Sequence, residues 1–140
     1  MFVVGTSPAQ ADCLDDAANY WSVPPAVAHA IAQQESGMRP WIVSKNHDGS
    51  RDIGLMQINS SWLPKLARYG ITAEDLLNNA CVNAYVGNWI LAQNIQRLGY
   101  NWDAIGAYNS PTPANRYRYA LAIYRRLMTA QAANSLPLDR

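Results

Sequence analysis

The sequence predicts an all-α fold in which a single domain occupies most of the 140 residues. In several segments apolar residues recur at steps of three and four, which is the period of a helix. Residues that start and stop helices bound these segments, for example Pro24 and Pro25 before one of them and Gly37 after it. No long segment alternates apolar and polar residues as a strand does. A small β-hairpin near residues 42–53 is the exception that we expect.

The composition indicates a globular protein and argues against a nucleic-acid partner. A hydrophobic content of 49% with 15% charged residues is typical of a globular chain that buries its own core. The net charge is +1 and no Lys/Arg-rich run occurs before residue 116, so we expect no nucleic-acid partner. No apolar run approaches the ~18 residues that span a bilayer. His29 and His47 are too scattered to complete a zinc site, so we expect no bound metal. We also expect no cofactor, and we expect the protein to be a monomer.

One predicted helix ends on a carboxylic acid, Glu35. Its apolar face collects Pro24, Val27, Ala28, Ile31 and Glu35 itself. Desolvation on such a face raises the pKa of a carboxyl group, and the negative end of the helix acts in the same direction. A raised pKa keeps the proton in place near neutral pH, as a general acid requires. The alternative is a solvated surface Glu, but Glu74 is the only other glutamate and Glu35 belongs to no charged run.

The segment Gly54-Leu55-Met56-Gln57-Ile58-Asn59 combines buried and polar positions in a short turn. Leu55 and Ile58 can bury, which leaves Gln57 and Asn59 to project as amides. Amides suit sugar hydroxyls because each one offers a donor and an acceptor. A tight turn whose amides bind the backbone is the alternative that the residues alone leave open.

The remaining periodic segments predict further helices. They cover residues 12–21, 60–69, 81–98 and 115–128, with shorter helical segments after Thr72 and over 102–107. The stripe expected to be buried in the helix over 81–98 comprises Val82, Tyr85, Val86, Trp89 and Ile90, with Ile95 as a further candidate. In the last helix the inward residues are expected to be Tyr119, Ala122, Ile123 and Leu127. We expect its arginines on a solvated face.

The first residues of the sequence and its two cysteines suggest that the protein is exported from the cytoplasm. Residues 1–11 read as a signal-peptide remnant because Ala9-Gln10-Ala11 has the small-x-small form of a cleavage site, although a disordered tail is the alternative. We expect one domain over residues 12–128 and a mobile tail over 129–140. Cys13 and Cys81 are the only cysteines, which suggests one disulfide in an exported protein, against the alternative of two buried thiols.

Three motifs in order carry a family resemblance. Glu35-Ser36-Gly37, the segment Gly54 to Asn59, and Ala107-Tyr108-Asn109 resemble the motifs of lytic transglycosylases related to goose-type lysozyme. The chain is most similar to the small periplasmic subgroup that accompanies type III secretion, type IV pilus and conjugation machinery. The resemblance extends from about Cys13 to Leu127.

This resemblance implies a lysozyme-like fold, a periplasmic location and peptidoglycan glycan strands as the substrate. The reaction it implies is cleavage of the β-1,4 bond between N-acetylmuramic acid and N-acetylglucosamine, with 1,6-anhydromuramyl ends as product. Glu35 matches the catalytic acid of the family. The expected substrate-binding residues are Ser36, Met56, Gln57, Asn59, Tyr108 and Asn109. For the arginines of the last helix, the alternative to a solvated face is that they meet acidic peptidoglycan stems.

The chain departs from the family pattern at two positions. Pro111 stands where a Gly commonly follows the Tyr-Asn motif, which bears on the shape of that loop. Asp52 stands where most members carry a small residue, and we count it with Glu35 as a candidate catalytic residue. Asp52 can stabilise an oxocarbenium-like state, act as a nucleophile as in lysozymes, or only bind the loop backbone or pair with Arg51 or Lys45.

Two other functions therefore stand beside the lytic transglycosylase. One is a hydrolytic, lysozyme-type muramidase that uses Asp52. The other is a peptidoglycan-binding scaffold without catalysis. An intact acid at position 35 favours an enzyme over the scaffold.

Overall fold

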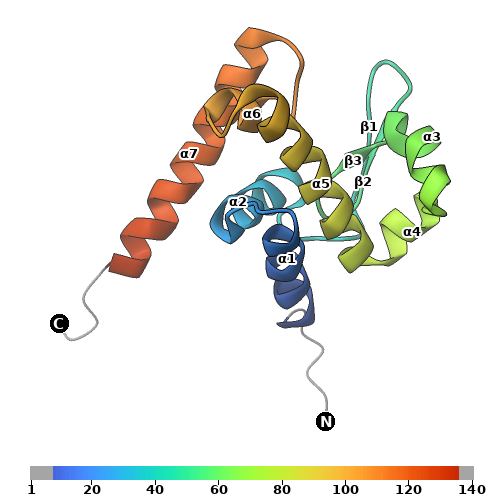
Figure 1. The fold of residues 1–140 in the computed structure, drawn as a ribbon, viewed down its shortest axis with the longest axis horizontal. Helices are drawn as coiled ribbons and strands as arrows, with labels where there is room; N and C mark the ends of the chain where they lie inside the picture. Colours follow the sequence, from blue (N-terminus) through green and yellow to red (C-terminus); the bar gives the residue numbers. More distant parts are fainter. Residues whose placement is uncertain (1–7, 136–140) are drawn as a thin grey trace. The chain divides into compact units, whose positions relative to one another are not determined.

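The structure, a computed structural model, describes residues 8–135 (Figure 1). The chain divides into two compact units, residues 1–90 and 91–140. The all-α prediction with a small hairpin is confirmed. Residues 1–7 of the predicted signal-peptide remnant and residues 136–140 of the predicted tail lie outside the described residues.

The first unit contains most of the elements. In chain order they are α1 (Pro8–Tyr20), α2 (Pro25–Ser36), β1 (Val43–Lys45), β2 (Arg51–Ile53), β3 (Ile58–Asn59), η1 (Ser60–Trp62), α3 (Leu63–Leu66), η2 (Ala67–Tyr69) and α4 (Ala73–Asn78). Helix α5 (Ala80–Leu98) begins in this unit and ends in the second, which also contains α6 (Trp102–Gly106) and α7 (Pro113–Ser135). Among these elements, no helix has the length and apolar content needed to cross a membrane.

Helix α2 begins and ends as its sequence predicts. Pro25 occupies the first helical turn, where a missing N–H costs nothing. Gly37 follows the helix in the left-handed conformation with φ 64°, and the N–H groups of Gly37 and Met38 bind the carbonyls of Gln33 and Ala32. The apolar face of α2 is buried, with Ile31 fully inaccessible.

The three strands form one antiparallel sheet in the order β1-β2-β3. The predicted hairpin is β1–β2, in which Ser44 pairs with Asp52. The third strand was not predicted, because its two residues are too few to show a period of two. In its register Asp52 pairs directly with Asn59, so two predicted site residues lie side by side across strands.

The predicted disulfide is confirmed. Cys13 in α1 is bonded to Cys81 at the start of α5, with Cα atoms 5.4 Å apart and 68 residues between them in sequence. The bridge therefore ties α1 to the start of α5.

The predicted buried stripe of α5 is only partly right. Val86 and Ile90 are buried, but Tyr85 is 36% exposed. The buried face instead includes three amides, Asn83, Asn88 and Asn94. Hydropathy alone assigns asparagine to the surface, whereas these side chains are buried because the protein supplies hydrogen-bond partners for them.

In the second unit, α6 packs against α7. The Asn101 side chain caps α6 by accepting from the Ala104 N–H at 2.9 Å. Arg116 of α7 forms an ion pair with Asp103 of α6, with 3.2 Å between nitrogen and oxygen. Helix α7 begins two residues before the predicted 115–128 segment and continues to Ser135. As predicted, Tyr119 and Ile123 are buried.

Removing the disulfide should destabilise the fold. The loop it closes is long, so the chain-entropy model gives a loss of about 4 kcal/mol for Cys13→Ser/Cys81→Ser. Urea unfolding of the oxidised protein and the double variant measures this difference. Equal unfolding midpoints would show that the bridge contributes nothing, and wild-type protein treated with a reductant serves as the control.

We expect Asp48, in the turn between β1 and β2, to have a lowered pKa. Hydrogen bonds from the Ser50 hydroxyl and backbone N–H lower the pKa of Asp48 below its ordinary value of 3.8. Because this pKa is depressed in the folded state, the turn gains stability above the unfolded pKa and loses it as pH falls through the folded value. NMR titration should give a midpoint below 3.8 in wild type. The Ser50→Ala variant should titrate at a higher pH, and an unchanged midpoint would contradict this assignment.

Candidate active site

Glu35 lies at the last turn of α2, directly before Ser36, and is half-buried. The Ser36 side chain is buried, with 1% of its surface exposed. Its hydroxyl donates to the Leu55 carbonyl at 2.7 Å and accepts from the Arg39 N–H at 3.1 Å. This bond fixes the helix end that carries Glu35 against the segment Gly54–Gln57.

The segment Gly54–Gln57 is a buried turn with unusual backbone angles. Gly54 has φ 77°, and Gln57 has φ 53°, which is uncommon for a residue with a side chain. At Gly54, a Cβ atom would overlap the Asn83 amide and lie 2.8 Å from the Leu76 carbonyl oxygen, so only glycine fits. Such a conformation persists only where the surroundings hold it in place.

Asn83 of α5 supplies much of that support. Its side chain is fully buried. The Oδ1 atom accepts from the Met56 N–H at 2.8 Å, and Nδ2 donates to the carbonyls of Ile53 at 2.8 Å and Leu76 at 3.0 Å. One amide thereby satisfies three backbone groups that water cannot reach. Sequence analysis missed Asn83, although an asparagine inside an apolar helical segment was a signal for it.

Gln57 supports the same turn through its own side chain. Its Nε2 atom donates to the carbonyls of Ile42 at 3.0 Å and Gly54 at 3.1 Å. Its Oε1 atom accepts from the Ser44 hydroxyl at 2.8 Å. We predicted that this amide binds sugar, but both of its N–H groups bind backbone carbonyls. This is the alternative stated above, a tight turn whose amides bind the backbone.

Met56 belongs to the turn, and its side chain is fully buried. Its sulfur accepts from the Asn88 side chain at 3.7 Å. Gly87 of α5 makes room for it, because a Cβ atom at Gly87 would overlap the Met56 sulfur. The absence of a side chain at Gly87 therefore lets the turn approach α5 closely.

Asp52 is half-buried on β2 and accepts two amide hydrogen bonds. Asn59 Nδ2 donates to Oδ1 at 2.8 Å and Asn46 Nδ2 donates to Oδ2 at 3.2 Å. Within residues 8–135 Asp52 forms no ion pair with Arg51 or Lys45 and accepts no backbone hydrogen bond; its partners are the side chains of Asn46 in the hairpin loop and Asn59 in β3. The two amides fix the orientation of the carboxylate.

Both the Nδ2 and the Oδ1 atom of the Asn59 side chain form hydrogen bonds within the protein. Besides Asp52, its Nδ2 atom binds the Ser50 hydroxyl at 3.1 Å. Its Oδ1 atom caps η1 by accepting from the Ser61 N–H at 2.9 Å. Asn59 thus joins the two ends of the β2–β3 turn.

Tyr108 and Asn109 belong to the second unit and follow α6 directly. The half-buried Tyr108 ring stacks on Tyr119, with ring centroids 6.4 Å apart. Asn109 is exposed. The loop with Pro111 is held at Ser110, whose hydroxyl accepts from the Thr112 N–H at 3.1 Å and whose carbonyl accepts from Arg116 at 3.1 Å.

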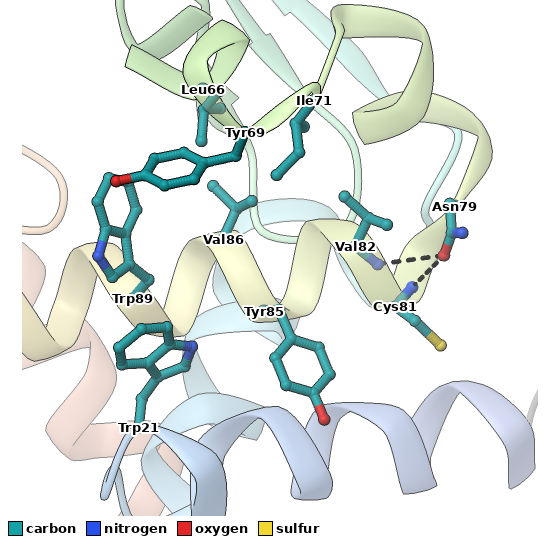
Figure 2. Close-up of a pocket in the computed structure, with 10 residues that line it drawn as sticks. All are labelled: Trp21, Leu66, Tyr69, Ile71, Asn79, Cys81, Val82, Tyr85, Val86 and Trp89. Carbon is teal, nitrogen blue, oxygen red and sulfur yellow. Dashed lines mark hydrogen bonds between the residues drawn. The ribbon is translucent and has the colours of Figure 1, made fainter.

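The first unit also contains an apolar groove of about 410 Å³ along α5. Its walls include Trp21, Tyr69, Tyr85 and Trp89 (Figure 2). None of the predicted catalytic or substrate-binding residues lines it. The described residues also contain no cluster of three or more His, Cys, Asp or Glu that could hold a metal ion.

Loss of the Asn83 side chain should disrupt the turn. Asn83→Ala removes the three hydrogen bonds that this side chain makes with the Met56 N–H and with two backbone carbonyls, so we expect a loss of at least about 3 kcal/mol in unfolding free energy. Asn78→Ala, at an exposed position of α4, is the matched control and should change stability by less than about 0.5 kcal/mol. Urea titration compares the two, and similar losses would contradict the role of Asn83.

Comparison with known proteins shows the family to which the chain belongs. Residues 12–121 match the model of the Transglycosylase SLT domain. The invasion protein IagB of Salmonella typhimurium (strain SL1344) is 39% identical over 96% of this chain and 89% of its own length. Protein IpgF of Shigella sonnei is 35% identical over 88% and 84% of the two chains, and an Escherichia coli X polypeptide is 36% identical over 89% and 77%. The chain therefore belongs to the SLT transglycosylase family and is an enzyme of the lytic transglycosylase type with a lysozyme-like fold.

Proposed function

We propose that this enzyme cleaves the β-1,4 bond between N-acetylmuramic acid and N-acetylglucosamine in peptidoglycan and leaves 1,6-anhydromuramyl ends. The observation that carries the proposal is the position of Glu35, half-buried on a helix end that Ser36 fixes to the turn Gly54–Gln57. The family match supports the substrate class.

Glu35 serves as both acid and base in this proposal. It first protonates the leaving glycosidic oxygen, so that the bond to the anomeric carbon breaks and an oxocarbenium-like state forms. The ionised Glu35 then accepts the proton of the sugar's own 6-hydroxyl, whose oxygen attacks the anomeric carbon. No water is consumed, and Glu35 ends the cycle protonated.

Asp52 is proposed to act through its charge and not as a nucleophile. Both of its oxygens accept amide hydrogen bonds, which orient the carboxylate and make its lone pairs less reactive. A fixed negative charge of this kind stabilises developing positive charge on the sugar without reorganising. A hydrolytic, lysozyme-type reaction through Asp52 is the competing mechanism.

The other predicted substrate residues divide into two groups. The polar atoms of Ser36, Gln57 and Asn59 already have partners within the protein, so we propose that these residues fix the wall of the site. Met56 supports this wall through its buried side chain. Tyr108 and Asn109 are proposed to bind the glycan directly, since the Asn109 side chain is exposed.

We further propose that the protein is exported to the periplasm and opens the wall locally for a secretion, pilus or conjugation apparatus. A disulfide is typical of an oxidising compartment, and IagB is named an invasion protein. In cells lacking this chain, apparatus assembly should be rescued by wild type and not by Glu35→Gln. Equal rescue by both would contradict a catalytic role, and a cytoplasmic pool with free thiols would contradict export.

Mass spectrometry of fragments released from purified peptidoglycan tests the reaction. Wild type should release fragments with anhydromuramyl ends, and Glu35→Gln should lower the rate by at least about 100-fold. Asp52→Asn should slow the reaction by about tenfold while keeping the anhydro product. Glu74→Gln is the matched control, because the only other glutamate has an ordinary place in the first turn of α4.

Each other outcome identifies a different function. Reducing ends in place of anhydro ends would show that water is the acceptor and that the enzyme is a muramidase of the lysozyme type. Retained wall binding without any fragments would indicate a scaffold. Equal rates for Glu35→Gln and Glu74→Gln would remove Glu35 from the mechanism.

A further inference from the structure

Helix α7 carries a second apolar stripe that is separate from its buried face. We call this stripe the α7 seam, and it consists of Ala114, Tyr117, Leu121, Tyr124 and Met128. The steps between these residues alternate between three and four, which is the heptad spacing of a coiled-coil seam. The seam is exposed, with 70% of Tyr117, 43% of Tyr124 and 42% of Met128 accessible.

The seam is shaped to receive side chains. Trp102 of α6 packs edge-on against Tyr124, with ring centroids 5.6 Å apart. Between α6 and α7 lies a hollow of about 250 Å³ lined by Trp102, Tyr117, Ala120, Leu121 and Tyr124. A hollow with aromatic walls beside a heptad seam is suited to the apolar knobs of a second helix.

Two cations flank the seam on one side. Arg118 and Arg125 directly follow Tyr117 and Tyr124 and so occupy the e positions of successive heptads. Both are exposed, and within residues 8–135 neither side chain makes a hydrogen bond or an ion pair. The whole of α7 contains four arginines and no acidic residue. In coiled coils the e and g charges choose the partner.

These charges argue against a second copy of this chain as the occupant. In an antiparallel pair of α7 helices, Arg118 and Arg125 would face the same arginines of the other copy, and like charges repel. In a parallel pair each e residue faces the g position five residues before it on the other helix, so Arg118 and Arg125 would face Pro113 and Ala120, which offer no counter-charge. The seam is also narrower than the wide apolar face of a helix that lies in a membrane surface.

We propose that the α7 seam binds an amphipathic helix of another protein, whose own apolar seam is flanked by acidic residues. The apolar knobs of that helix enter the hollow beside Trp102, and its carboxylates pair with Arg118 and Arg125. The interaction needs no residue of the catalytic proposal, so it can be tested in an inactive variant.

Fluorescence anisotropy with synthetic peptides tests the proposal on the full chain. The probe is a labelled three-heptad helix with leucine at a and d and glutamate at e and g, and the matched peptide has lysine at e and g. Wild type should bind the glutamate peptide at least about tenfold more tightly than the lysine peptide. Arg118→Glu/Arg125→Glu should reverse this preference.

Two control variants separate the seam from general effects. Arg51→Glu/Arg68→Glu changes the net charge by the same amount at exposed sites outside α7, and should keep the wild-type preference. Tyr117→Ser/Met128→Ser replaces two exposed seam residues, so folding should be retained while binding of the glutamate peptide weakens by about tenfold.

Several outcomes would overturn the proposal. Equal binding of the two peptides, binding of neither, or a preference that Arg118→Glu/Arg125→Glu fails to reverse would each do so. Sedimentation that shows self-association lost in Tyr117→Ser would assign the seam to a second copy. Binding to phosphatidylglycerol vesicles through Arg118 and Arg125, without binding of the glutamate peptide, would assign it to a membrane surface.

Discussion

The buried backbone of the turn at Gly54–Gln57 is the constraint on which the first unit depends. A turn has few hydrogen bonds of its own, and buried N–H and C=O groups without partners are costly. Here the partners are side chains from three different elements: Ser36 at the end of α2, Asn83 in α5, and Gln57 of the turn itself. The packing of each element therefore depends on the others.

This arrangement connects stability to the proposed chemistry. The same serine that supports the turn comes directly after the proposed acid, so the position of Glu35 follows from the position of the Leu55 carbonyl. Asp52 is oriented on the neighbouring strand by Asn59, whose side chain also caps the next helical segment. A catalytic group placed by buried hydrogen bonds is preorganised, which is what electrostatic catalysis requires.

The features that could be predicted from the sequence are those determined by the residues at the position itself. Pro25 and Gly37 bound α2 because they act on the backbone at their own positions, and Cys13 and Cys81 pair because no other cysteine exists. The expected stripe of α5 was partly wrong, since Tyr85 is exposed whereas Asn83 is buried. The burial of Asn83 depends on carbonyls that are 7 and 30 residues away in sequence, and no periodicity in a single segment contains that information.

Native-state hydrogen exchange at the Met56 amide tests the central claim most directly, because this N–H donates to the buried Asn83 side chain. If the turn is held by the surrounding elements, this amide exchanges only when the first unit unfolds, with an opening free energy equal to that of global unfolding. Exchange of this amide at the rate of an exposed loop would contradict the claim. The turn would then open locally, and the position of Glu35 could not depend on it.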